Sequence, residues 1–119
     1  MKANDVAQVA AKVLYVESNV IDLDKSLFAD YGMSSMDFVD FAFELKTVSK
    51  KDFTPDDLWP INSMVTNPKY FSQNKWTEEG IGELQTILSG DKALQGETSV
   101  QDLYKLFTAN FVERRLNAL

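Results

Sequence analysis

The chain has 119 residues, of which 45% are apolar and 25% are charged, a balance that fits one globular domain. It contains no cysteine and no histidine, which excludes disulfides, zinc–thiolate sites, thiol catalysis by the chain itself and imidazole chemistry. Twelve basic and eighteen acidic residues give a net charge of −6, so nucleic acid is a poor partner.

The negative charge is concentrated in one third of the chain. Residues 17–57 hold ten acids and four lysines, so the rest of the sequence is neutral on balance. This segment is either a surface offered to basic partners or a solvated face that keeps the chain soluble.

The N-terminal residues lack the features of a targeting segment. Asp5, Gln8 and Lys12 interrupt the apolar run that a signal peptide needs. No stretch approaches the roughly 20 apolar residues of a membrane-spanning helix. We therefore expect a cytoplasmic monomer with no membrane span and no metal site. The start methionine favours a free-standing protein, while a piece cut from a larger synthase stays open.

Apolar residues at helical spacing from Val6 to Leu14 predict a first helix over about 3–17, with Asn4 or Asp5 near its cap. The stretch 18–33 has no sustained period and predicts a long loop that holds at most a short turn. Three apolar side chains are expected to attach this loop to the core: Leu23, Leu27 and Phe28.

A second helix begins at Ser34 or Ser35 and runs to about residue 48, because Ser34-Ser35-Met36-Asp37 matches a capping box. On a helical wheel the acids share one narrow stripe, and apolar residues occupy nearly all the rest. We therefore expect this helix to be central in a bundle, with only its acidic stripe in water. The stripe is Asp37, Asp40 and Glu44, and the apolar residues are Met36, Phe38, Val39, Phe41, Ala42, Phe43 and Leu45.

The middle of the chain is less regular. Thr54-Pro55-Asp56-Asp57 predicts a helix start with a cap and a proline at the first position, and Pro60 limits that helix. Residues 61–76 are predicted to form an ordered loop with several aromatic side chains. A short helix over about 78–89, ended by Gly90, follows Thr77.

Ser99-Val100-Gln101-Asp102 repeats the capping-box pattern and opens a last helix over about 99–116. No strand pattern and no internal repeat is present. The predicted fold class is therefore all-α, a small four-helix bundle in a single domain over 1–119, with an extra segment over about 49–97 between the second and last helices.

The segment Phe28 to Phe41 joins a loop that ends in glycine to a serine on the first turn of an acidic helix. A hydroxyl placed there suits an attached phosphate, since free amides and the helix dipole stabilise anions. The segment resembles the acyl carrier protein family and its D-x-G-x-D-S-L block. Asp30, Gly32, Ser35 and Met36 match, with Met36 in place of leucine and Ser34 where the family usually carries aspartate.

Two further segments support the resemblance. Asp24-Lys25-Ser26-Leu27-Phe28 resembles the family's loop after its first helix, and Thr98 to Leu103 resembles the start of its last helix. The middle region is unmatched. Its aromatic residues either close an enlarged core, or shape an acyl pocket or a partner surface: Trp59, Tyr70, Phe71 and Trp76.

The resemblance implies a carrier rather than an enzyme. A phosphopantetheinyl transferase would move 4'-phosphopantetheine from coenzyme A onto Ser35, and the arm's thiol would hold an acyl group as a thioester. Asp37, Asp40 and Glu44 would meet basic patches on partner enzymes, and Met36 would line the exit of the arm. Expected partners are the transferase and a ketosynthase, acyltransferase or ligase of a specialised lipid or polyketide-type pathway.

Other interpretations stay open at the level of sequence. Ser35 could be a plain helix-start serine, Ser34 could be the modified residue, and the acids could be only a solvated face. Val39 and Phe43 are expected in the core rather than at the cargo. A peptidyl or aminoacyl carrier and an unmodified carrier-like interaction domain are the alternative functions. A carboxylate hydrolase built on Asp30, Asp37 or Asp40 is disfavoured, because Asp37 and Asp40 are set to face water on one helix.

Overall fold

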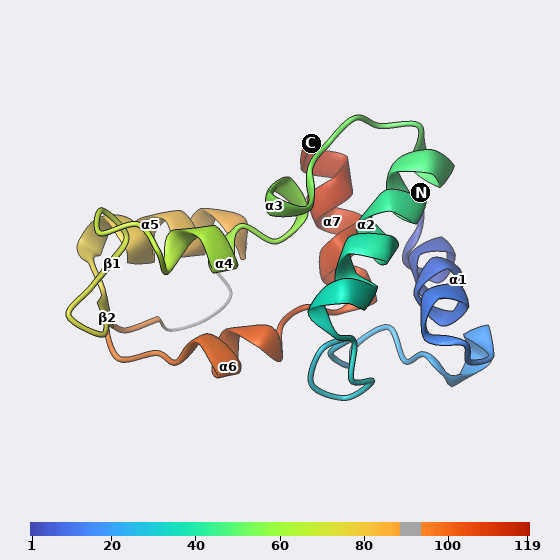
Figure 1. The fold of residues 1–119 in the computed structure, drawn as a ribbon, viewed down its shortest axis with the longest axis horizontal. Helices are drawn as coiled ribbons and strands as arrows, with labels where there is room; N and C mark the ends of the chain where they lie inside the picture. Colours follow the sequence, from blue (N-terminus) through green and yellow to red (C-terminus); the bar gives the residue numbers. More distant parts are fainter. Residues whose placement is uncertain (89–93) are drawn as a thin grey trace.

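In the computed structural model, helices form a bundle at one end of the molecule and a smaller lobe at the other end (Figure 1). The structure describes residues 1–88 and 94–119, and its overall extents are 41 × 27 × 25 Å. The all-α class is confirmed, with one small hairpin added. In chain order the elements are α1 (Ala3–Leu14), the 3-10 turn η1 (Ser18–Val20), α2 (Ser35–Ser49), α3 (Pro55–Leu58), α4 (Ile61–Met64), β1 (Phe71–Ser72), β2 (Lys75–Trp76), α5 (Glu78–Ile87), α6 (Val100–Tyr104) and α7 (Ala109–Ala118).

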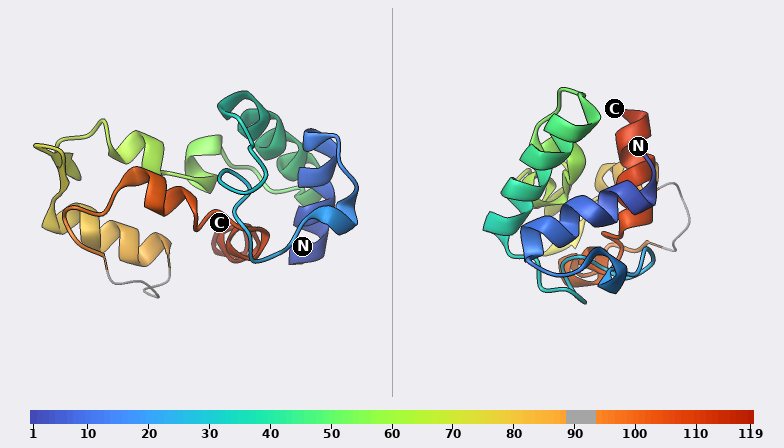
Figure 2. Two further views of the ribbon diagram at one scale, coloured as in Figure 1. Left: turned by 90° about the horizontal axis from the view of Figure 1, so that it is seen from below. Right: turned by 90° about the vertical axis from the view of Figure 1, so that its right-hand side faces the viewer.

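The bundle consists of α1, α2, α3 and α7, and we call the segment 61–104, with α4, the hairpin, α5 and α6, the inserted lobe. Figure 2 shows α1 beside both α2 and α7, with the inserted lobe at the far end. The N-terminus of α1 is fixed to α7, because the Ala3 amide donates to the Glu113 carboxylate. One continuous hydrophobic cluster runs through the bundle and the lobe.

The first helix ends three residues earlier than predicted. Tyr15 adopts a left-handed conformation with φ 59°, and the Val16 amide turns back to donate to the Ala11 carbonyl, which closes the helix. The long loop that follows holds η1, as expected. Leu27 is fully buried, and Leu23 and Phe28 are half-buried, which confirms their attachment to the core.

The helix predicted to start at Ser34 or Ser35 is confirmed as α2, but the expectation that it buries every side except its acids is wrong. Only four of its side chains are buried: Phe38, Phe41, Ala42 and Leu45. Met36 is 79% exposed, Phe43 is 68% exposed and Val39 is also exposed. The physical reason is that α2 packs on the bundle with one side only, so an apolar row remains in water.

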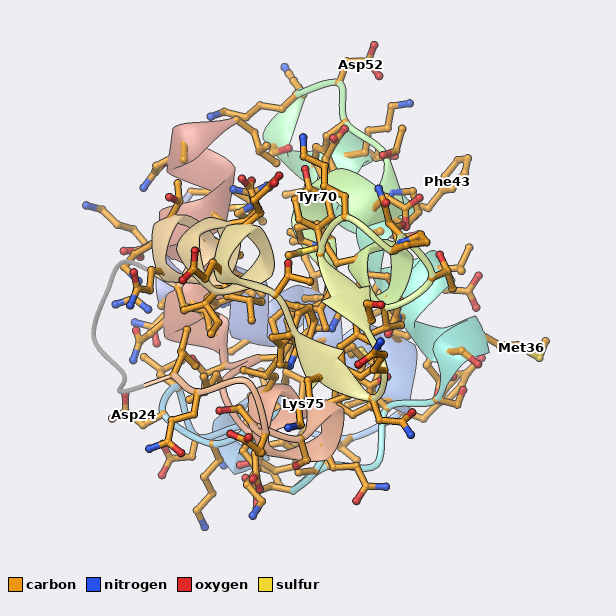
Figure 3. All side chains as sticks on the ribbon, turned by 90° about the vertical axis from the view of Figure 1, so that its left-hand side faces the viewer. Asp24, Met36, Phe43, Asp52, Tyr70 and Lys75 are labelled. Carbon is orange, nitrogen blue, oxygen red and sulfur yellow. The ribbon has the colours of Figure 1, made fainter. Side chains whose placement is uncertain are left out.

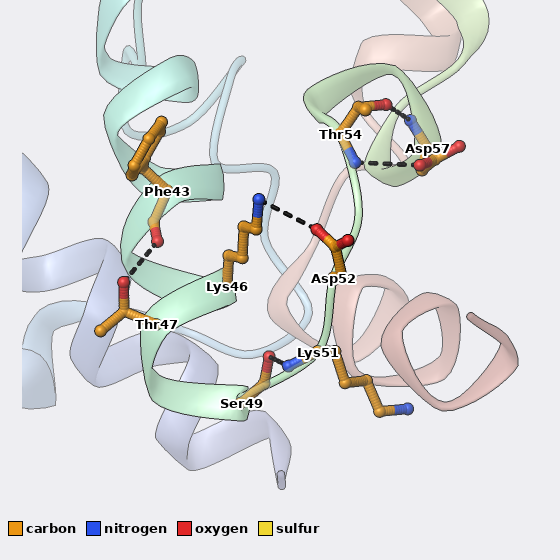
Figure 4. A network of polar contacts seen from close by, with 8 residues as sticks. All are labelled: Phe43, Lys46, Thr47, Ser49, Lys51, Asp52, Thr54 and Asp57. Atoms are coloured by element: carbon orange, nitrogen blue, oxygen red, sulfur yellow. Dashed lines mark hydrogen bonds and ion pairs between the residues drawn. The ribbon is translucent and has the colours of Figure 1, made fainter.

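Polar contacts fasten the link from α2 to α3 (Figure 4). Lys46 Nζ pairs with an Asp52 carboxylate oxygen at 3.0 Å. Thr54 Oγ1 accepts from the Asp57 amide at 3.2 Å, and Asp57 accepts from the Thr54 amide at 2.9 Å. With Pro55 at its first position, the helix start predicted at Thr54 is confirmed.

The segment predicted as a loop over 61–76, and the prediction of no strands, both need correction. It contains α4 and an antiparallel hairpin in which Phe71 pairs with Trp76. The turn residues Gln73 and Asn74 have φ values of 54° and 62°, and two left-handed residues are what a tight hairpin turn requires. The following helix is confirmed as α5, and Gly90, its expected end, lies outside the described residues.

The last helix, predicted over 99–116, is divided into α6 and α7. Ser99 caps α6 as expected, accepting from the Asp102 amide at 3.0 Å. The Phe107 carbonyl then accepts from the Leu27 amide at 2.9 Å, and Thr108 caps a new helix by accepting from the Phe111 amide. Hydrogen bonds to the long loop therefore interrupt a sequence pattern that is periodic throughout.

Aromatic rings join the inserted lobe to the bundle. Trp59 is 1% exposed and lies 5.1 Å from the Phe107 ring and 6.0 Å from the Phe28 ring, both outside the lobe. Its ring also lies 6.3 Å from that of Tyr104, which belongs to the lobe. Trp76 is buried inside the lobe, with Phe71 edge-on at 5.0 Å. The interpretation that the middle aromatics close an enlarged core is confirmed for both tryptophans.

Candidate functional site

The start of α2 is built by a left-handed glycine and a capping serine. Gly32 has φ 67°, which turns the chain, and the Met33 amide then donates to the Leu27 carbonyl at 3.0 Å. Ser34 Oγ accepts from the Asp37 amide at 3.1 Å, and Asp37 accepts from the Ser34 amide at 3.1 Å. The hydroxyl of Ser34 is therefore committed to the cap.

Ser35 is the first residue inside the helix and is exposed. Its hydroxyl makes no hydrogen bond to any residue that the structure describes. The amides of Ser35 and Met36 also lack acceptors within residues 1–88 and 94–119, as expected for the first turn of a helix. A free hydroxyl thus lies beside two free N–H groups at the positive end of a 15-residue helix, where an anion is stabilised.

The loop before Ser35 is fixed to the end of the inserted lobe through Ser26, which is 1% exposed. Ser26 Oγ donates to the Tyr104 carbonyl at 2.6 Å and accepts from the Ala29 amide at 3.0 Å. The Ser26 amide donates to Asp30 at 2.8 Å. Asp30, the acid of the matched motif, therefore stabilises the loop in this structure.

A cavity of about 330 Å³ opens beside Ser35. Phe28, Met33 and Phe38 line it from the bundle, and Asn62 and Tyr104 line it from the inserted lobe. Tyr104 Oη donates to Asn62 Oδ1 at 2.9 Å. Neither lobe residue was predicted for the site, because a contact across 42 residues leaves no local pattern in the sequence.

The four residues predicted for partner recognition all lie on α2, but their environments differ. Met36 is largely exposed, and it projects from the molecule as Phe43 does (Figure 3). Asp37 belongs to the capping box, and Glu44 pairs with Lys12 Nζ at 3.1 Å. Asp40 is exposed and has no ion-pair partner in the part of the chain that the structure describes.

Within the described ranges, no helix has the length and apolar character needed to cross a bilayer. The same residues contain no group of three or more acids placed to hold a metal ion.

A family model described as "Phosphopantetheine attachment site" matches residues 4–63, which is half of the chain. The chain belongs to this phosphopantetheine-binding carrier family. The matched region is where the family attaches 4'-phosphopantetheine covalently, and it contains α1, the long loop, α2 and α3. Membership gives the chain a phosphopantetheine-carrier role and implies an encounter with a phosphopantetheinyl transferase.

The start of α2 fits the group that this carrier family attaches. A hydroxyl and two amides with no partner among residues 1–88 and 94–119, together with an adjacent cavity, suit a tethered phosphodiester and its arm. No curated protein and no solved structure matches the chain. The family match ends within α4, so most of the inserted lobe and all of α7 lie beyond it.

Proposed function

We propose that Ser35 is the attachment residue and that the chain carries acyl intermediates for a specialised lipid or polyketide-type pathway. The observation that supports Ser35 most is the division of tasks between the two serines. Ser34 Oγ is occupied by the Asp37 amide, whereas the Ser35 hydroxyl is exposed and unbonded in the described structure. Modification at Ser35 therefore costs no helix-capping bond.

In the proposed loading step, Ser35 Oγ forms a bond to the phosphorus of coenzyme A that bears pantetheine. The phosphoanhydride bond breaks, 3',5'-ADP leaves, and the serine proton passes to a base of the transferase. The amides of Ser35 and Met36 would stabilise the charge of the attached phosphodiester. When bound, the arm supplies a thiol that carries acyl groups as thioesters, chemistry that a chain without cysteine cannot provide.

Partner recognition is proposed for the outer side of α2, formed by Met36, Val39, Phe43 and Asp40. Exposed apolar side chains supply contact area, and the Asp40 carboxylate, which pairs with none of the described residues, steers basic patches toward it. Asp37 and Glu44 add negative charge, although each already has a bond inside the chain. Val39 and Phe43, expected in the core, thus join the proposed surface.

Several finer assignments belong to the same proposal. The carrier is one domain over 1–119, acts in the cytoplasm, performs no catalysis itself, and meets a ketosynthase, acyltransferase or ligase. The absence of cysteine and histidine supports a non-catalytic role. A peptidyl or aminoacyl cargo and an unmodified interaction domain are the alternatives that the loading experiment addresses.

The test is incubation of the purified chain with coenzyme A and a broad-specificity phosphopantetheinyl transferase, followed by intact-mass measurement. Wild type and the matched control Ser34→Ala are expected to gain one phosphopantetheine group, and Ser35→Ala none. Loading of Ser35→Ala would contradict the assignment of Ser35. A wild-type chain that gains no mass with several transferases would favour the unmodified interaction domain.

A further inference from the structure

We propose that the inserted lobe binds the oxygen of a short oxygenated acyl group tethered at Ser35, through the side chains of Asn62 and Tyr104. This inference rests on the proposed attachment at Ser35 and concerns the cargo that the site accepts. Its starting point is the cavity beside Ser35, whose wall comes from both parts of the molecule. The bundle side is apolar, whereas the lobe side carries an amide and a phenol.

Tyr104 is held in position at several points. Its carbonyl accepts from Ser26 Oγ at 2.6 Å, and its ring lies 5.3 Å from Phe28 and 6.3 Å from Trp59. Its hydroxyl donates to Asn62 Oδ1 at 2.9 Å. Because packing and hydrogen bonds fix the side chain before any cargo arrives, little conformational entropy is lost on binding.

The pair retains hydrogen-bonding capacity after its own bond is made. The amide nitrogen of Asn62 has no acceptor among residues 1–88 and 94–119, which leaves two N–H donors. Tyr104 Oη still has lone pairs that can accept. A keto or hydroxyl oxygen on the acyl group matches these donors and acceptors, and a saturated hydrocarbon does not.

The size of the cavity limits the length of the group. Its volume of about 330 Å³ is near the lower end of the roughly 300–1,000 Å³ range of small-molecule pockets. Phe28 and Phe38 line it from the bundle and can contact the carbon atoms, and the exposed Asn62 and half-buried Tyr104 line it from the lobe. The cavity therefore suits a short acyl group with one polar substituent.

The surface of the inserted lobe points to the same role. The exposed large apolar side chains of the described residues all lie outside it: Tyr15, Val16, Val20, Met36, Val39, Phe43, Val48 and Leu119. The face of the lobe in Figure 3 presents residues such as Tyr70, which is half-buried, and Lys75, which pairs with Glu97. The described residues of the lobe therefore present no exposed apolar row like that of α2.

The test loads the full chain from 3-hydroxybutyryl-coenzyme A or butyryl-coenzyme A with a broad-specificity transferase, and intact mass verifies each product. The two groups differ by one hydroxyl. The readout is the rate at which hydroxylamine cleaves each thioester, divided by the rate for the same thioester on free coenzyme A. Wild type is expected to protect the hydroxybutyryl group about two- to tenfold more than the butyryl group, the range that one hydrogen bond provides.

Asn62→Ala and Tyr104→Phe are expected to abolish this preference. Ser63→Ala, an exposed neighbour outside the cavity lining, should retain it. In the unmutated chain, the side-chain amide resonances of Asn62 should shift with the hydroxybutyryl group and not with the butyryl group. This spectrum keeps the test valid if a variant folds poorly.

Equal protection of both thioesters in wild type, or unchanged Asn62 resonances, would overturn the inference and leave the attachment at Ser35 intact. A preference lost equally in Ser63→Ala would also overturn it. A chain that gains no mass would overturn the proposed attachment, and the inference with it. The two failures are therefore distinguishable by the mass measurement that precedes the kinetics.

Discussion

Adjacent serines at the start of α2 have different environments, and the difference carries the functional proposal. Ser34 has extended backbone angles and accepts the Asp37 amide, as an N-cap residue does. Ser35 makes no such bond to any residue that the structure describes, and it is exposed. The family's usual aspartate at the position of Ser34 would accept the same amide, so serine there preserves the geometry of the turn.

Ser34→Ala is expected to lower the free energy of unfolding by about 0.5–2 kcal/mol, because the Asp37 amide loses its acceptor. Ser34→Asp should retain the stability of wild type, and Ser35→Ala should change it by less than about 0.5 kcal/mol. Urea unfolding followed by circular dichroism measures all three. A larger loss in Ser35→Ala than in Ser34→Ala would show that the roles of the serines are reversed.

At this scale the sequence predicted the capping box, since Ser34 and Asp37 are three residues apart and their bond is local. It did not predict that Asp30 would bond to the Ser26 amide, or that Tyr104 would reach the site. The bond from Ser26 to the Tyr104 carbonyl spans 78 residues. Such partners depend on how the lobe packs on the loop, which no short motif encodes.

In helix α2, helical periodicity did not predict which apolar side chains are buried. The wheel separated acids from apolar residues correctly, but it could not tell buried apolar residues from exposed ones, because Phe41 and Phe43 are chemically alike. Phe41 is fully buried and Phe43 is 68% exposed. The last predicted helix failed for a related reason, since bonds from the long loop divide α6 from α7 at Phe107.

Asp40→Lys is expected to slow loading by the transferase about two- to fivefold at low salt, because an exposed charge acts mainly on the rate of encounter. Stability should change little, since Asp40 pairs with no residue that the structure describes. The initial loading rate, measured at two salt concentrations, provides the test. Glu83→Lys, an equal charge reversal on α5, is the matched control and should load at the wild-type rate.

Two glycines of α5 are expected to respond differently to substitution by alanine. A Cβ atom on Gly80 would lie 2.1 Å from the Tyr70 carbonyl oxygen, whereas one on Gly82 meets nothing within 4 Å. Gly80→Ala should therefore destabilise the chain by about 1–3 kcal/mol. Gly82→Ala should stabilise it by up to about 1 kcal/mol through helix propensity. Thermal unfolding measures the stability of both variants. Equal changes in stability would contradict the close packing of α5 on the hairpin.

In the whole molecule, the inserted lobe and the bundle share one hydrophobic cluster. Trp59 contacts both the Phe28 ring and the ring of Tyr104 in the lobe, and Trp76 lies inside the lobe. The family match reaches only residue 63, so the sequence pattern alone did not show how the remaining segment packs on the bundle. The contacts that hold this segment include the ring of Tyr104 against Trp59 and Phe28.

Because the cluster is continuous, the lobe and the bundle are expected to unfold together. Trp59→Phe and Trp76→Phe each leave one tryptophan as a probe. Trp59 Nε1 has no hydrogen-bond partner among the described residues, so phenylalanine there removes no bond. For each variant, the fluorescence transition should coincide with the loss of helical circular dichroism. A fluorescence transition of Trp76 that precedes the loss of helix would show that the lobe unfolds alone.

The most direct test of the carrier assignment is the intact mass of the protein purified from its own cell, with peptide mapping of the modified residue. The account predicts a phosphopantetheine group, free or acylated, on the peptide that contains Ser35, bonded to Ser35 Oγ. A native chain that is unmodified throughout, or one that carries the group on Ser34 or another residue, would contradict it.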